Sequence, residues 1–194
     1  MEFSAPVRCT LAAVSPDGAY LATTLGVRLT VFGVAAQQEV ASFTCLDDPQ
    51  HLEWSPDSTL LLTAVFSRRA VQLWSVEDTG WHGRIDEADA GLAAARWAPT
   101  SRHVLTTAEL SLRVTIWSLV DKRVCYIKYL KDVASSLAFS PDGEFLAVVE
   151  RRGCRDHVSL FSTSAWELVK VSCAGPLVCL SVVSSCAGIL WFVC

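Results

Sequence analysis

The 194-residue sequence lacks the patterns that mark several large functional classes. Lys and Arg number 16 against 20 Asp and Glu, so there is no basic excess of the kind that nucleic-acid-binding domains carry. Residues 1–6 contain no basic segment followed by an apolar run, so we expect no secretory signal and a cytoplasmic protein. No Gly-rich phosphate loop, nucleophile elbow or zinc-protease motif occurs, which argues against an enzyme.

Cysteine and histidine are present, but not at metal-binding or redox spacing. None of the eight cysteines belongs to a Cys-x-x-Cys pair and the four histidines are scattered, so we expect neither a metal nor another cofactor. In a reducing cytosol, cysteines on apolar strands serve as small buried hydrophobes. We interpret the first four in this way: Cys9, Cys45, Cys125 and Cys154.

Two short segments recur four times in the same phase. The first is a proline turn, and its prolines are 40, 43 and 42 residues apart: Pro16, Pro56, Pro99 and Pro141. The second ends in an aromatic residue, and these aromatics are 42, 43 and 44 residues apart: Phe32, Trp74, Trp117 and Phe161. Two independent markers therefore share a period that matches the ~40–45 residues of a WD propeller blade.

Each copy also has the composition of a small antiparallel sheet. Ser15-Pro16-Asp17-Gly18 suits a tight turn, because proline presets φ at the second position and glycine fits the last. The apolar run at 20–24 predicts a strand that is covered on both faces. The alternating segment at 71–74 predicts a strand with one polar side, and 124–129 predicts an outer strand. Four strands in each copy make a blade.

On these residues the sequence resembles the WD-repeat family over about residues 8–171. The resemblance implies an all-β fold of about four four-stranded antiparallel propeller blades, at about 8–45, 46–88, 89–131 and 132–171 of a 1–171 repeat region. Four blades would form an incomplete or open propeller, whose exposed blade edges predict self-association. The aspartate of the Trp-Asp dipeptide is replaced by Ser75, Ser118, Ser162 and Gly33. His51 is the nearest remnant of the usual Gly-His pair and Asp156 of the usual polar network, so we expect the blades to depend mainly on apolar packing.

Several stretches go beyond the generic repeat, namely 44–47, 50–55, 81–82, 85–87, 90–92, 126–129 and 150–152. They resemble the amino-terminal part of the Wrap family of WD-repeat proteins (WD-repeat protein eight), which are scaffolds of the centrosome and spindle pole. The resemblance implies a non-catalytic protein-binding scaffold that helps to anchor microtubule minus ends and supports spindle and centriole or cilium assembly. It also implies a protein partner, the afadin- and α-actinin-binding coiled-coil protein of the centrosome.

The repeat phase is lost after about residue 171. Residues 171–194 are uncharged and contain four cysteines, so 172–194 is predicted to be an apolar tail rather than a WD repeat. Three interpretations stay open. In the first, the tail is the altered end of a truncated isoform, and whether this short form functions stays open. In the second, residues 177–194 anchor the protein in a membrane. In the third, the tail forms a strand pair that packs on the last blade. The 18 residues of 177–194 lie at the lower limit for a membrane-spanning helix, and serines and a glycine dilute them.

Charged loops suggest where a partner would bind. In WD blades, loops between second and third strands share one rim with the loops that join blades. Here the loops between second and third strands carry Arg28, Arg68, Arg69, Arg113, Arg151 and Arg152. The loops that join blades carry Asp47, Asp48, Asp86, Glu87 and Asp89. Such alternating charge would fix the register of a protein partner, although an ordinary solvated rim is the alternative.

Tryptophan supplies the last candidate. Trp54, Trp74, Trp97 and Trp117 are in phase with the repeat and are predicted to be core residues. Trp81 is out of phase, so it is either an exposed binding anchor or a residue packed under an outer strand. The predicted interaction residues are therefore Arg68, Arg69, Arg151, Arg152 and Trp81.

Overall fold

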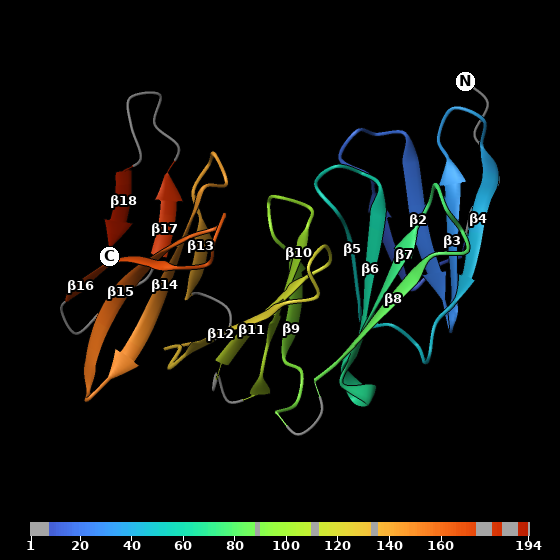
Figure 1. Ribbon diagram of the computed structural model, residues 1–194. Coiled ribbons are helices and arrows are strands. Elements are labelled where there is room, and N and C mark those ends of the chain that lie inside the picture. The colour runs from blue at the N-terminus through green and yellow to red at the C-terminus, as the bar shows by residue number, and fades with distance from the viewer. Residues whose placement is uncertain are drawn as a thin grey trace. The chain divides into compact units, whose positions relative to one another are not determined.

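The computed structural model describes residues 8–87, 90–109, 113–132, 136–173, 180–183 and 190–193. These residues form β-strands, turns and short 3₁₀ segments such as η1 (Phe66–Arg68), and they contain no α-helix. The chain divides into two compact units, Met1–Trp97 and Ala98–Cys194, and each is described by itself (Figure 1).

The first unit contains two four-stranded sheets in which each strand pairs with the next along the chain. Their strands are β1 (Leu11–Val14), β2 (Tyr20–Leu25), β3 (Arg28–Gly33), β4 (Gln38–Thr44), β5 (His51–Trp54), β6 (Leu60–Val65), β7 (Ala70–Ser75) and β8 (His82–Asp86). Strand β5 is in contact with β1 and also with β9 (Ala94–Trp97). Strands β1, β5 and β9, the first strands of three successive sheets, therefore lie side by side.

Two more four-stranded sheets follow, with strand orders β12-β11-β10-β9 and β13-β14-β15-β16. Their further strands are β10 (His103–Thr107), β11 (Arg113–Ser118), β12 (Val124–Lys128), β13 (Leu137–Phe139), β14 (Phe145–Arg152), β15 (Arg155–Ser162) and β16 (Leu168–Cys173). The prediction of an all-β chain with four four-stranded antiparallel sheets is confirmed.

The proline turns have the predicted structure, and their polar side chains close them. The Ser15 hydroxyl donates to the Asp17 carboxylate and accepts the amide of Tyr20 at 2.9 Å. The same contacts recur at Ser55 and at Ser140, where Ser140 bonds to Asp142. Turns of neighbouring sheets also touch, because the Asp17 amide donates to the Ser58 hydroxyl at 3.1 Å. The serine hydroxyls and nearby amides lower the pKa of Asp17 and Asp142, so these turns are built around ionised carboxylates.

Three of the four repeat tryptophans lie in the core, as predicted. Trp54, Trp74 and Trp97 are buried and Trp117 is half-buried. The indole N–H of Trp54 donates to the carbonyl of Ala13 on β1 at 3.0 Å, which ties the second sheet to the first. Phe43 stacks on Trp74 with ring centroids 5.1 Å apart, in a cluster that also contains Leu29, Val31 and Leu61. Burial of one such side chain contributes roughly 1.5–3 kcal/mol.

Polar contacts within the sheets add to the apolar packing on which we expect the blades mainly to depend. The Trp74 indole donates to the hydroxyl of Thr63 at 3.0 Å, and the Trp117 indole donates to that of Thr106 at 2.8 Å. Each pair links the second and third strands of its sheet. Because a buried N–H without an acceptor costs about 1–3 kcal/mol, these threonines matter to the stability of both sheets.

The tail contains a strand pair. Strands β17 (Leu180–Val183) and β18 (Leu190–Val193) form a two-stranded antiparallel sheet, and β17 is in contact with β13. This arrangement matches the third interpretation of the tail, in which strands pack on the last blade. No helix among the described residues is long and apolar enough to cross a membrane.

The interpretation of the first four cysteines as buried hydrophobes is wrong for two of them. Cys45 is buried and Cys125 half-buried, but Cys9 and Cys154 are exposed. Cys9 precedes β1, and Cys154 lies in the β14–β15 turn at φ 62°. Both therefore lie outside the apolar strand interiors on which the interpretation depended.

Candidate functional site

Arg68 and Arg69 lie where η1 leads into β7. The Arg68 guanidinium contacts the Asp47 carboxylate at 2.9 Å, and both side chains are exposed. The backbone amide of Asp48 and the guanidinium of Arg68 lower the pKa of Asp47. Arg69 has a left-handed backbone (φ 55°), and its carbonyl accepts the amide of Glu87 at 3.0 Å. A loop between second and third strands thus meets loops that join blades, as the rim hypothesis requires.

The other rim residues of this unit make more local contacts. Arg28 pairs with Glu39 on the adjacent strand at 3.0 Å, and Asp86 pairs with Arg84 of its own strand at 2.8 Å. Asp89 lies outside the described residues. The alternating rim is therefore clearest around Arg68.

Trp81 lies in the turn before β8, and 38% of its surface is exposed. Its ring lies close to Gly83, where an added Cβ would be 3.6 Å from the indole. The exposed part leaves an aromatic surface that a partner can reach. Its role as an interaction residue remains a prediction.

Arg151 belongs to an ion cluster at the β14–β15 hairpin. Its guanidinium makes two hydrogen bonds to Asp156, at 2.7 and 3.1 Å, and Lys131 Nζ lies 2.8 Å from the same carboxylate. The Asp156 side chain is buried, whereas 53% of the Arg151 side chain is exposed. Hydrogen bonds from Arg151 and Lys131 lower the pKa of Asp156 from 3.8 to about 2. Asp156, expected as the last remnant of a WD network, is therefore the centre of an ion cluster.

Arg152 has an equivalent arrangement beside it. Its guanidinium contacts the Glu150 carboxylate at 2.6 Å, with Glu150 buried and Arg152 56% exposed. The guanidinium also lies over the ring of Tyr129, 5.4 Å from the centroid. The two arginines are thus held from below by buried acids, and their outer surfaces remain accessible.

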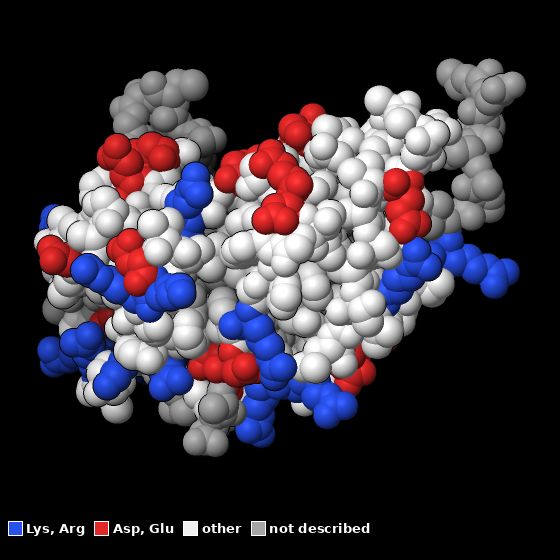
Figure 2. Space-filling view, turned by 45° about the vertical axis from the view of Figure 1, so that its right-hand side comes forward, with Lys and Arg blue, Asp and Glu red and all other residues white. Residues whose placement is uncertain are grey.

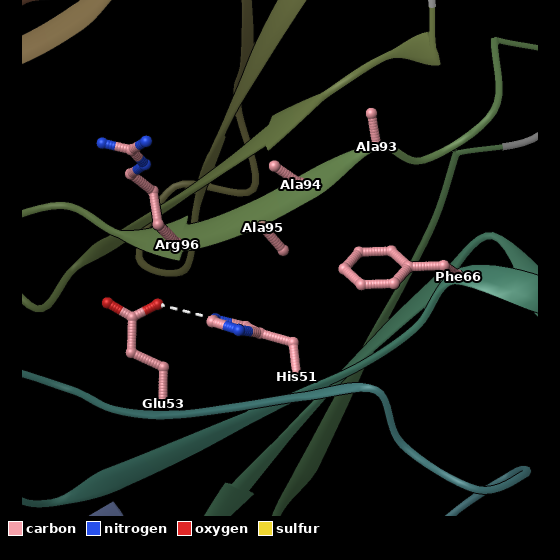
Figure 3. Close-up of a pocket in the computed structure, with 7 residues that line it drawn as sticks. All are labelled: His51, Glu53, Phe66, Ala93, Ala94, Ala95 and Arg96. Carbon is pink, nitrogen blue, oxygen red and sulfur yellow. Dashed lines mark hydrogen bonds and ion pairs between the residues drawn. The ribbon is translucent and has the colours of Figure 1, made fainter. Parts of the chain in front are cut away.

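A pocket of about 350 Å³ lies in the first unit, between β5, β9 and η1 (Figure 3). His51 and Glu53 project from β5, two residues apart and therefore on one face, and His51 Nε2 lies 3.3 Å from the Glu53 carboxylate. Phe66 lies at the His51 end of the pocket, and Ala93–Arg96 form the wall across from His51 and Glu53. The small alanine side chains leave the space open.

The lining of this pocket combines charged side chains with one aromatic ring. Its lining includes an acid, two basic groups and an aromatic ring, but no serine, threonine or cysteine nucleophile. Among the residues that the structure describes, no group of three or more His, Cys, Asp or Glu is placed to hold a metal ion. The pocket thus offers charge and shape for recognition.

Comparison with known proteins decides the family. No protein-family model matches the chain. A mouse (Mus musculus) protein described as WD repeat-containing protein WRAP73 is 47% identical over 172 residues, which cover 88% of the chain. The chain belongs to the WD-repeat family. This WD-repeat chain spans 37% of the length of WRAP73.

Solved structures show the same fold at low sequence identity. The propeller domain of Myceliophteria thermophila Cps50 (Swd1) matches 87% of the chain and 56% of its own length, at 12% identity and a TM-score of 0.60. Hydrazine synthase of Kuenenia stuttgartiensis matches 84% of the chain and 48% of its own, at 14% identity and a TM-score of 0.58. At such identity the likeness concerns the fold alone. The four sheets are therefore β-propeller blades, as predicted.

Two features of the WD-repeat chain were missed by sequence reasoning. The first is the pocket. His51 was interpreted only as a remnant of the Gly-His pair, although His51 and Glu53, two residues apart on a strand, point to the same side of the sheet. The contacts of Tyr126 and Tyr129 with arginines were the other. Arg152 and Tyr129 lie 23 positions apart, so the pairing of strands is needed to bring them together.

Proposed function

We propose that the chain is a non-catalytic protein-interaction module of the cytoplasm that acts at the centrosome and spindle pole. There it would contribute to anchoring microtubule minus ends and to spindle and centriole or cilium assembly. Its proposed partner is the afadin- and α-actinin-binding coiled-coil protein of the centrosome. The observation that carries the proposal is the 47% identity with WRAP73 over 172 residues, together with the Wrap-family stretches.

The charged loop around Arg68 supports the interaction role. Arg68 and Asp47 form an exposed pair, and Arg69 is exposed beside it. Exposed pairs contribute little to stability, typically 0–1 kcal/mol, but complementary charge guides association and orients partners. This loop is therefore suited to recognition more than to holding the fold together.

The test is localisation in cultured cells. The chain, fused to a fluorescent protein, is expected to concentrate at spots that stain for γ-tubulin and to co-precipitate the coiled-coil partner. Joint reversal of the loop charges, Arg68→Glu with Arg69→Glu, is expected to reduce the co-precipitated partner severalfold.

Arg102→Glu is the control, because Arg102 is also an exposed arginine, but it lies in the proline turn between β9 and β10 and is not one of the rim residues. Its recovery of partner is expected to equal that of the unmodified chain. Diffuse fluorescence without partner recovery would overturn the proposal, and undiminished binding by the double variant would remove the Arg68 loop from it.

A further inference from the structure

A cluster of cations and exposed tyrosines lies in one part of the second unit. It consists of Arg113, Tyr126, Lys128, Tyr129, Arg151 and Arg152, which we call the basic–tyrosine surface. Lys and Arg side chains gather at the lower left of the view in Figure 2, over the second unit. The sequence favours this location, since residues 98–194 carry 10 Lys and Arg against 8 Asp and Glu, whereas residues 1–97 carry 6 against 12.

Hydrogen bonds and ring contacts make this surface contiguous. The Arg113 guanidinium lies over the Tyr126 ring, 5.0 Å from its centroid, and Arg152 lies over Tyr129. The Arg151 amide donates to the Tyr129 carbonyl at 2.8 Å, so the segment that follows β12 runs along β14. Lys128 precedes Tyr129 at the end of β12 and is exposed.

The acids that balance these cations are hidden beneath them. Glu150 and Asp156 are each 2% exposed, whereas Arg151 and Arg152 are more than half exposed. A guanidinium has five N–H donors, and Asp156 uses only part of the set on Arg151. A partner that approaches this surface therefore contacts the positively charged arginines. Their ion pairs already restrain their rotamers, which lowers the entropy cost of binding.

The exposed rings add a second kind of contact. Tyr126 and Tyr129 are 55% and 57% exposed, and each is held by the arginine that stacks on it. Tyrosine and arginine are the residue types enriched at protein interfaces. Lys128 adds a charge whose ammonium group makes no hydrogen bond or ion pair with any residue that the structure describes.

We propose that the basic–tyrosine surface binds an acidic segment of a protein partner, with its carboxylates on Lys128, Arg151 and Arg152 and its chain against the two tyrosines. The proposal rests on the proposed protein-binding function and names the partner chemistry. A nucleic acid is the less favoured occupant, because nucleic-acid-binding domains carry a clear basic excess, whereas residues 98–194 carry 10 Lys and Arg against 8 Asp and Glu.

Binding of a fluorescein-labelled octaglutamate peptide to the full chain tests the proposal by fluorescence anisotropy. Lys128→Glu is expected to weaken binding about tenfold, since one exposed charge contact is lost and a repulsion replaces it. Lys122→Glu is the matched control, because Lys122 lies in the β11–β12 turn, at the other end of that hairpin, and makes no ion pair with a described residue. It should leave the affinity within about twofold, and both variants should melt like the unmodified chain.

Absence of peptide binding, or equal losses in the two variants, would overturn the proposal. Tighter binding of a 20-nucleotide oligothymidine than of the peptide would overturn it in favour of a nucleic acid. Localisation separates this result from the proposed function. A chain that reaches the centrosome but fails to bind the peptide refutes only the inference, and one that binds the peptide but stays diffuse refutes only the centrosomal role.

Discussion

Asp156 shows how a single buried carboxylate can organise a hairpin. It receives hydrogen bonds from Arg151 and Lys131, so three charged groups from β14, β15 and the segment after β12 meet at one point. A buried carboxylate without such partners would become protonated or would destabilise the fold. The low pKa of Asp156 is therefore coupled to folding of the second unit.

The pH dependence of stability should reveal this coupling. The folded pKa of about 2 lies below the ordinary value of 3.8, so the carboxylate stabilises the fold at pH above 3.8. That contribution is lost as the pH falls from about 4 to about 2. Urea unfolding should show that Asp156→Asn is less stable than the unmodified chain at pH 7, with the difference shrinking below pH 4.

Asp86→Asn is the control variant, because the Asp86 side chain is paired with Arg84 but remains about half exposed. It should change stability little at any pH, as exposed pairs usually do. A gap between Asp156→Asn and the unmodified chain that stays constant from pH 7 to pH 2 would contradict the assigned role of Asp156.

At the scale of the elements, the proline turns carry both local structure and contacts between sheets. Gly18 and Gly143 close two of these turns with φ of 73° and 74°, a conformation that costs other residues about 1 kcal/mol or more. The two sites differ in their surroundings. A Cβ at Gly143 would lie 2.9 Å from the Pro99 Cβ, whereas one at Gly18 would meet nothing within 4 Å.

Alanine substitution separates these two effects. Gly18→Ala is expected to cost about 1 kcal/mol from backbone strain alone. Gly143→Ala is expected to cost at least 1 kcal/mol more, because Pro99 in the preceding proline turn must move. Thermal unfolding of both variants measures the difference. Equal losses would mean that the two turns do not pack rigidly on each other.

This contrast also marks how far the sequence could predict the structure. Serine, proline and aspartate act within a few positions, so the turns and their flanking strands could be predicted from local chemistry. The contact of Pro99 with Gly143 joins residues 44 positions apart and depends on how two sheets pack. The same limit applies to the candidate sites. Arg151 and Arg152 were recognised by their loop, but the pairing of Arg151 with Asp156 and the nearby tyrosines required the strand register.

At the scale of the whole molecule, low net charge combines with an exposed apolar strand. The net charge of −4 gives weak mutual repulsion between copies. Strand β16 is the edge of its sheet and exposes three large aliphatic side chains, Leu168, Val169 and Val171, each about half accessible. Such an edge offers unpaired backbone groups beside apolar surface, which favours pairing with another chain. It is the described feature that best fits the predicted self-association.

Lysine on this strand should therefore favour the monomer. Val169→Lys places a charge on the exposed edge, as natural edge strands do, and is expected to lower the associated fraction severalfold at micromolar concentration. Val40→Lys is the matched control, since Val40 is also about half exposed on an outer strand, β4, but it is the only exposed aliphatic side chain of that strand. Sedimentation velocity over a hundredfold concentration range measures both. A chain that is monomeric throughout, or equal effects of the two lysines, would exclude β16 as the associating edge.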